Sequence, residues 1–217
     1  MSPSIDELRT QLYSAVVADA LDQLGFRHQS PRVSLFACTA PTAVLIGRCK
    51  TTLWADMAHV DPHPYELELK AVDECQPDDV LIAAASGSMR SGIWGELLTT
   101  AAMNTGCVGA IVDGAIRDVS KISYLNFPVF ARGRCVYDSL NRQRVVDIDV
   151  SVELDGVCFV PGDLVIADCD GIVVIPKSVE EEVLRLALAK VQGENTVRDA
   201  IRNGMKATDA FRKYGIL

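Results

Sequence analysis

Several features that define other classes of protein are missing from this chain of 217 residues. It contains no run close to the roughly 18 apolar residues that mark a membrane span. The residues after Met1 include Asp6, Glu7 and Arg9 and form no apolar signal core. We therefore expect an intracellular, cytoplasmic protein that does not cross a membrane.

An excess of positive charge is also missing. The chain has 21 Lys and Arg against 29 Asp and Glu, which gives a formal net charge of −8. Duplex nucleic acid favours basic surfaces, so we expect no nucleic-acid partner. Acidity alone does not name a substrate, because a single arginine can still bind an anion.

The cysteines lack the spacing of a metal-binding or disulfide framework. There are seven of them, an odd number, and no two stand in a C-x-x-C arrangement. Most lie in apolar runs, where cysteine behaves as a small hydrophobic residue. We expect free thiols in a reducing compartment.

The composition that remains is that of an ordinary globular protein, with 49% hydrophobic and 23% charged residues. The length suits a single domain over residues 1–217. Helices are predicted at about 4–25, where Ser4 and Glu7 form a capping box and a break near Tyr13–Ser14 divides the segment. A helical arm is predicted at about 178–214, with a second capping box at Ser178 and an interruption at Gly193.

The middle of the chain predicts a sheet. Residues 80–85 form a continuous apolar run, typical of a strand buried on both faces. Further β-like runs at 44–47, 49–53, 110–116 and 128–133, with helices at 65–73, 96–104 and 119–125, indicate βαβ units. From 144 to 175, short strands and tight turns indicate an antiparallel or barrel-like layer. We predict an α/β fold: a layered α-β-β-α sandwich with a mixed, barrel-like sheet between the terminal helices.

The stretch from Gly92 to Asp118 carries the main candidate site. Glu96 opens the predicted helix, and Asp118 follows the predicted strand. About ten helical residues cover about 15 Å and five or six strand residues cover about 18 Å, so a strand running back returns to the start of the helix. Glu96, Arg117 and Asp118 should therefore lie at one end of this unit.

These residues fit the binding of a small 2-oxo acid. Arg117 offers a planar fork for a carboxylate, and the first-turn N–H groups of Leu97 and Leu98 can receive an anionic oxygen. The carboxylates of Asp118 and Glu96 are hard ligands for Mg²⁺ or Mn²⁺. A metal so placed stabilises an enolate, the species formed in retro-aldol cleavage. The residues alone equally allow a surface Arg117–Asp118 ion pair and a Glu96 favoured by the helix dipole.

A second candidate metal site is less convincing. His59, Asp61 and His63 stand on alternate residues and could converge if they formed a strand. Pro62 and Pro64 interrupt any strand, so we interpret this segment as a polar connecting loop.

The sequence resembles the class II pyruvate aldolases. These include the 4-hydroxy-4-methyl-2-oxoglutarate / 4-carboxy-4-hydroxy-2-oxoadipate aldolases and the related ribonuclease E activity regulators. The resemblance covers nearly the whole chain. It rests on Gly-Glu-Leu-Leu at 95–98, residues 109–114 with Arg117-Asp118, and the segments 127–133, 161–163 and 168–176.

The resemblance implies a role for each candidate residue. Asp118 would be the direct metal ligand, and Glu96 would hold a metal-bound water. Arg117 would bind the substrate with Gly95 and the amides of Leu97 and Leu98. An acid from a neighbouring subunit, here best matched by Glu194, would complete the site through water. The family then implies a homotrimer or a hexamer of two trimers.

The resemblance also leaves alternatives open. The family usually has an acid three positions after the aspartate, whereas this chain has Lys121, which either changes the substrate or metal preference or faces solvent. A non-catalytic regulator that binds ribonuclease E or a partner protein is the main alternative to the aldolase, although the terminal helices favour the enzyme. A Schiff-base mechanism has only Lys121 nearby. A methyltransferase lacks support, because no G-x-G-x-x-G loop follows a strand.

Overall fold

The computed structural model describes residues 3–216, so the outermost residues of the predicted domain, 1–2 and 217, lie outside it. The chain begins with α1 (Ile5–Gln11) and α2 (Ser14–Gln23). Ser4 and Glu7 make both hydrogen bonds of the predicted capping box at α1. The predicted break at Tyr13–Ser14 is also confirmed, and its cause lies far along the chain. The Asp168 carboxylate accepts hydrogen bonds from Ser14 N and Oγ, both at 2.6 Å, and so caps the start of α2.

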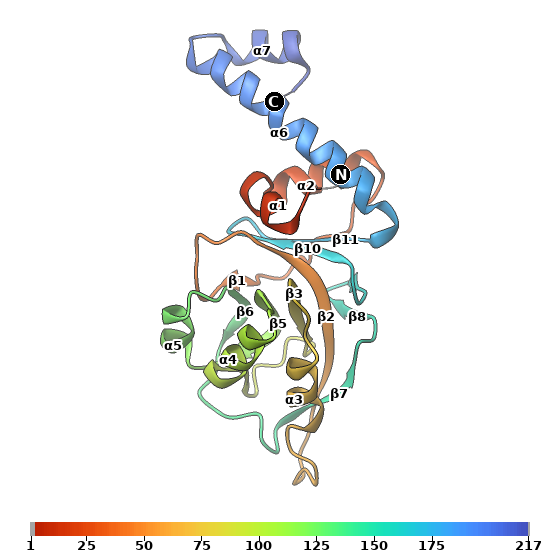
Figure 1. Ribbon diagram of the computed structural model, residues 1–217, viewed down its shortest axis with the longest axis vertical. Helices are drawn as coiled ribbons and strands as arrows, with labels where there is room; N and C mark the ends of the chain where they lie inside the picture. Colours follow the sequence, from red (N-terminus) through yellow and green to blue (C-terminus); the bar gives the residue numbers. More distant parts are fainter. Residues whose placement is uncertain (1–2, 217) are drawn as a thin grey trace.

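A nine-stranded mixed sheet forms the centre of the molecule (Figure 1). Its main path runs β1-β6-β5-β3-β2-β10-β11, with β4 beside β5 and β7 beside β2. The strands β2, β3, β5 and β6 are parallel neighbours, and β4 is parallel to β5. The remaining pairs are antiparallel. The bounds are β1 (Phe36–Ala37), β2 (Leu45–Asp56), β3 (Asp79–Ala84), β4 (Gly92–Trp94), β5 (Gly109–Ile116), β6 (Val129–Arg134), β7 (Gln143–Ile148), β10 (Leu164–Ala167) and β11 (Ile172–Ile175).

Helices cover one face of this sheet and a hairpin covers part of the other. The helices are α3 (Glu66–Asp73), α4 (Glu96–Asn104) and α5 (Val119–Tyr124), and the hairpin pairs β8 (Val152–Leu154) with β9 (Val157–Phe159). Side chains alternate between two cores because successive strand residues point to opposite faces. Leu81 belongs to the core under the helices, whereas Ile82 belongs to the core beneath the hairpin. This explains the continuous apolar run of β3.

A third core joins the terminal helices to the antiparallel end of the sheet. Val16 of α2 and Val183 of α6 (Glu180–Arg202) pack there with Ile166 of β10. The far half of α6 extends beyond this core, where α7 (Ala207–Tyr214) turns back beside it (Figure 1). The predicted architecture is therefore confirmed, with a curled mixed sheet, N-terminal helices and a long C-terminal helix. Among residues 3–216, no helix combines the length and apolar character needed to cross a membrane.

The predicted division of the first long strand is wrong. Residues 45–56 form one continuous strand, β2, instead of separate runs at 44–47 and 49–53. Gly47 does not break the strand; a Cβ there would overlap the carbonyl oxygen of Asp78. Arg48 also continues the strand, and its guanidinium pairs with both carboxylate oxygens of Glu180.

Two predictions for the C-terminal arm are also wrong. The capping box at Ser178 does not form, because Lys177–Val179 make a 3₁₀ turn and α6 starts without a side-chain cap. The helix also continues through Gly193 without interruption. A Cβ at this glycine would overlap the side chain of Ile216, so the glycine accommodates the returning tail.

Candidate active site

The carboxyl ends of β4 and β5 bring the three predicted residues together. The two strands are parallel neighbours, so Glu96 after β4 and Arg117-Asp118 after β5 emerge at the same edge. Asp118 Oδ2 accepts a hydrogen bond from the Glu96 N–H at 3.3 Å and lies 4.0 Å from Arg117 Nε. The predicted convergence is thus confirmed as geometry.

Two glycines allow these strands to approach so closely. A Cβ on Gly95 would lie 2.9 Å from Asp118 Oδ2 and 3.3 Å from Arg117 Nε. A Cβ on Gly92 would lie 2.6 Å from the Cys135 carbonyl oxygen and 2.9 Å from Arg117 Cβ. At each position the nearest distance is shorter than a normal contact of a Cβ atom, so the two glycines make room for the arginine and the aspartate.

The backbone at Asp118 is held in an unusual conformation. Its φ of 55° and ψ of 28° place it in the left-handed region. Aspartate visits this region more readily than most residues, but the conformation still has a cost of order 1 kcal/mol. The residue stands at the start of α5 and makes no side-chain cap to that helix. Its carboxylate, 39% exposed, points instead toward the start of α4.

The start of α4 offers hydrogen-bond donors beside these side chains. The first backbone bond of the helix joins Thr99 N–H to the Gly95 carbonyl oxygen. The N–H groups of Leu97 and Leu98 precede it and belong to the first turn, whose donors have no intrahelical partner. The Glu96 carboxylate accepts a hydrogen bond from Thr100 Oγ1 at 3.0 Å. The Leu97 side chain is 78% exposed.

Another acid, Asp138, which the sequence did not reveal, pairs with Arg117. Arg117 Nη2 lies 2.5 Å from Asp138 Oδ2. Asp138 Oδ1 accepts hydrogen bonds from the Tyr65 hydroxyl at 2.6 Å and from the Leu140 N–H at 2.8 Å. These hydrogen bonds and the charge of Arg117 lower the pKa of Asp138 against the opposing effect of burial, its largest single influence. Asp138 follows β6, the next parallel strand, and that position is the signal that could have identified it.

Behind Asp138 lies a third acid, Glu68 of α3. It is only 8% exposed, and its Oε2 accepts a hydrogen bond of 3.4 Å from Ser139 Oγ. Burial, reinforced by the negative charge of Asp138, raises the pKa of Glu68 to about 8. The same two influences, with the hydrogen bond to Asp138, raise the pKa of Tyr65 to about 12. Arg117 thus pairs with one partly exposed acid, Asp138, and its charge also influences a buried acid, Glu68.

Two other predicted residues lie elsewhere. Glu194 is on α6, where it accepts a hydrogen bond from Tyr13 and lies 3.7 Å from Arg198 Nη2. The arm extends away from α4 and α5, so one chain does not bring Glu194 to Asp118 (Figure 1). Lys121 is exposed on α5 and forms no ion pair with any residue between 3 and 216.

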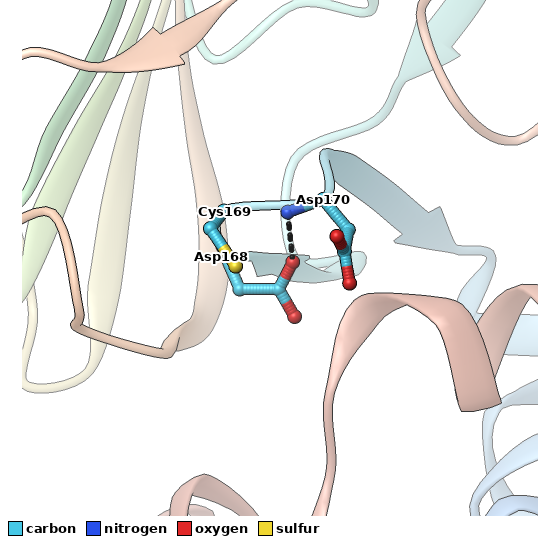
Figure 2. A group of neighbouring side chains, drawn as sticks. All are labelled: Asp168, Cys169 and Asp170. Carbon is cyan, nitrogen blue, oxygen red and sulfur yellow. Dashed lines mark hydrogen bonds between the residues drawn. The ribbon is translucent and has the colours of Figure 1, made fainter.

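The His59–His63 segment is a connecting loop, as predicted. Asp61 accepts a hydrogen bond from the His63 N–H and pairs with Arg144, while the His63 side chain is largely exposed. Within the described residues, the one cluster with metal-ligand geometry is Asp168, Cys169 and Asp170. Figure 2 shows Asp168 accepting a hydrogen bond from the Asp170 N–H. Because Asp168 also caps α2, we interpret this cluster as structural.

Fold and site together define an α/β protein with an arginine and acids gathered at the carboxyl ends of parallel strands. A family model described as RraA-like, Aldolase/RraA, matches residues 14–174. The chain therefore belongs to the RraA-like family.

Named relatives and solved structures agree with this membership. A protein of Halalkalibacterium halodurans named "Putative 4-hydroxy-4-methyl-2-oxoglutarate aldolase" is 38% identical over 143 residues, which are 66% of this chain and 68% of that one. An uncharacterized protein from Pseudomonas syringae has a TM-score of 0.85 at 28% identity, covering 98% of this chain and 96% of that one. Streptomyces coelicolor RraAS2, described as an unusual member of the RNase ES inhibitor RraA family, has a TM-score of 0.79 at 29% identity, covering 91% and 98%.

Proposed function

We propose that this protein is a divalent-metal-dependent aldolase. It would cleave a 4-hydroxy-2-oxo acid to pyruvate and a carbonyl product, and would also decarboxylate oxaloacetate, because both reactions pass through a pyruvate enolate. The observation that carries the proposal is the meeting of Arg117, Asp118 and the start of α4 at one strand edge. The aldolase name of the relative from H. halodurans supports the same reading.

The donor set fits Mg²⁺ or Mn²⁺. Asp118 and Glu96 present carboxylate oxygens, the hard ligands that these ions prefer. Two carboxylates are too few to enclose an ion completely, which suits an ion that keeps several of its waters. The Asp118 side chain is partly exposed, so an ion could reach it from solvent. When bound, the ion would supply Lewis-acid stabilisation of the charge that develops on the 2-oxo oxygen.

The chain's own residues would hold the substrate. Asp138 engages Nη2 of Arg117, which leaves the other donors of the guanidinium for the substrate carboxylate. The amides of Leu97 and Leu98, at the positive end of the helix dipole, would stabilise the developing oxyanion. Glu96 would orient the water that accepts the proton of the substrate's 4-hydroxyl group.

A neighbouring subunit would complete this site. Glu194 is the proposed donor, which requires a homo-oligomer, in this family a trimer or a hexamer. Leu97, Val136 and Tyr137 are exposed apolar side chains, close in sequence to the site residues, that such a neighbour could cover.

A regulator of ribonuclease E is the second candidate function, because the RraAS2 structure shares most of this fold. A regulator has no need of the acids around Arg117. It would therefore bind its partner equally well after Asp118→Ala and would release no pyruvate.

The deciding experiment is a coupled pyruvate-release assay with oxaloacetate and several 4-hydroxy-2-oxo acids. We expect turnover with Mg²⁺ or Mn²⁺ and its loss with EDTA, restored by added metal. Borohydride with pyruvate serves as the control for a Schiff base and should leave the enzyme active. Metal-independent turnover, or inactivation by borohydride, would contradict the proposal.

A further inference from the structure

We infer that Glu68 is a positioning residue for Arg117, and that ionisation of Glu68 weakens the binding of an anionic substrate at that arginine. The inference rests on the proposed role of Arg117 in binding a 2-oxo acid. It adds a residue from α3, outside the stretch between Gly92 and Asp118, to the control of the site.

The first argument is mechanical. Tyr65 is the residue before α3 and Glu68 lies in the first turn of that helix. The Tyr65 hydroxyl donates a hydrogen bond to Asp138, and Glu68 accepts a hydrogen bond from Ser139. The helix thus holds two consecutive residues of the loop after β6, and Asp138 in that loop holds Arg117.

The second argument is the enclosure of Glu68. Its side chain lines a cavity of about 10 Å³ together with Tyr65 and Gln143. Gln143 Oε1 accepts hydrogen bonds from Ser91 N and Oγ, which fixes the orientation of the amide. Its Nε2 is buried and has no hydrogen-bond partner among residues 3–216. Glu68 is only 8% exposed, so bulk solvent screens its carboxyl little.

The third argument is the charge around Glu68. Asp138, in the loop after β6, raises the pKa of Glu68 through its negative charge, and Arg117, at the end of β5, lowers it. The other ionisable groups on the elements that pack against α3 already have partners or lie in solvent. These groups are Arg144 paired with Asp61, Lys50 paired with Asp149 and Glu74, Arg48 paired with Glu180, Asp56 bonded to Ser88, Glu96 bonded to Thr100, and the exposed Asp147 and His63.

These arguments give a direction for the pH dependence. The pKa of Glu68 is raised to about 8 by burial and by Asp138. Near neutral pH, Glu68 is protonated and uncharged, so of these two acids only Asp138 carries a negative charge near Arg117. Above pH 8 the ionised Glu68 adds a second negative charge near the arginine. It should repel a substrate carboxylate and weaken binding by about five- to tenfold.

The test compares the wild-type protein with Glu68→Gln, an uncharged isostere of the protonated acid. KM and kcat for pyruvate release from oxaloacetate are measured with Mg²⁺ from pH 6.5 to 9.5. We expect the wild-type KM to rise about five- to tenfold above pH 8 with a smaller change in kcat. The variant should match the wild-type KM at pH 7 and stay level to pH 9.5. Glu66→Gln is the matched control, because Glu66 is exposed on the same helix, and it should follow the wild type.

A level KM in the wild type, or an equal rise in Glu68→Gln, would overturn the inference. A second measurement does not depend on turnover or on the variant's folding. NMR titration of the wild-type protein should show a glutamate carboxyl carbon with a midpoint near pH 8 and a shift of the Arg117 Nε–H resonance at the same midpoint. If these signals titrate together but no pyruvate is released, the proposed function fails while the coupling stands. If the Arg117 signal stays constant, the coupling itself is wrong.

Discussion

Arg117 and Asp138 form an ion pair, with 2.5 Å between Nη2 and Oδ2. One side of the guanidinium is therefore already engaged, and the Tyr65 hydroxyl fixes the carboxylate that engages it. The arginine is oriented by the protein before any substrate arrives. Such preorganisation reduces the entropy that binding would otherwise cost.

Replacing Arg117 by lysine should show that the planar guanidinium of Arg117 matters as well as its positive charge. A lysine is a point charge that cannot serve Asp138 and bind a substrate carboxylate in a bidentate fashion. We expect kcat/KM for pyruvate release to fall about 100-fold, which corresponds to about 2.7 kcal/mol of transition-state stabilisation. Arg185→Lys is the control, since the exposed Arg185 of α6 pairs with Glu182 and with no other acid among residues 3–216. Activity above about one third of wild type in Arg117→Lys would contradict the prediction.

Asp118→Asn should separate chemistry from stability. Asparagine tolerates the left-handed backbone of this position, and the side chain is partly exposed, so the free energy of unfolding should change by less than about 1 kcal/mol. Pyruvate release should nevertheless fall about 100-fold or more, and added Mg²⁺ should no longer raise it. The control is Asp155→Asn, a left-handed aspartate at the turn between β8 and β9, whose activity should equal that of the wild type. Full Mg²⁺-dependent activity in Asp118→Asn would remove Asp118 from the site.

Glu68 should make the protein less stable at alkaline pH. Its pKa is about 8 in the folded state against 4.5 as the ordinary value, so the folded state holds the proton more tightly. The stabilising contribution is complete below pH 4.5 and is lost as the pH rises through 8. The loss amounts to at most about 5 kcal/mol. Urea unfolding at pH 6 and pH 9 should show that Glu68→Gln gains stability relative to wild type at the higher pH. A constant difference between the two proteins would contradict this.

Gly193 and Ile216 should be coupled in a double-mutant cycle. Alanine is favoured over glycine inside a helix by about 1 kcal/mol, but a Cβ at position 193 overlaps Ile216. Gly193→Ala alone should therefore give little stability and should increase hydrogen exchange in α7. In an Ile216→Ala background the same change should stabilise by about 1 kcal/mol, measured by denaturant unfolding. Additive effects would show that the overlap has no energetic consequence.

The sequence could predict the part of the site that depends on local chain geometry. Glu96, Arg117 and Asp118 lie on consecutive elements, so helix and strand lengths were sufficient to bring them together. Asp138 was missed, although it follows β6, the next strand of the chain, which pairs with β5. Glu68 could not be found in this way, because it comes from α3, much earlier in the chain, and only the packing of α3 against the loop after β6 brings it close to the site.

The same distinction explains the errors. Gly47 and Gly193 resemble breaks in a local pattern, because glycine weakens both strands and helices. In the structure each faces another segment, the Asp78 carbonyl in one case and Ile216 in the other. Glycine marks a close approach at both positions, and the approaching segment is not apparent from the neighbouring residues. The break at Tyr13–Ser14 was predicted correctly, but its cause, Asp168, is equally remote.

The strand β2 belongs to two halves of the molecule at once. Along one edge it pairs with β3 and thus with the strands that carry Arg117, and along the other it pairs with β10 and β7. Neither half can melt without breaking hydrogen bonds that the other half needs. We expect unfolding to be cooperative across the whole sheet. A destabilising substitution where α6 packs on β10 would therefore also lower the free energy of unfolding of the strands that carry the candidate active site.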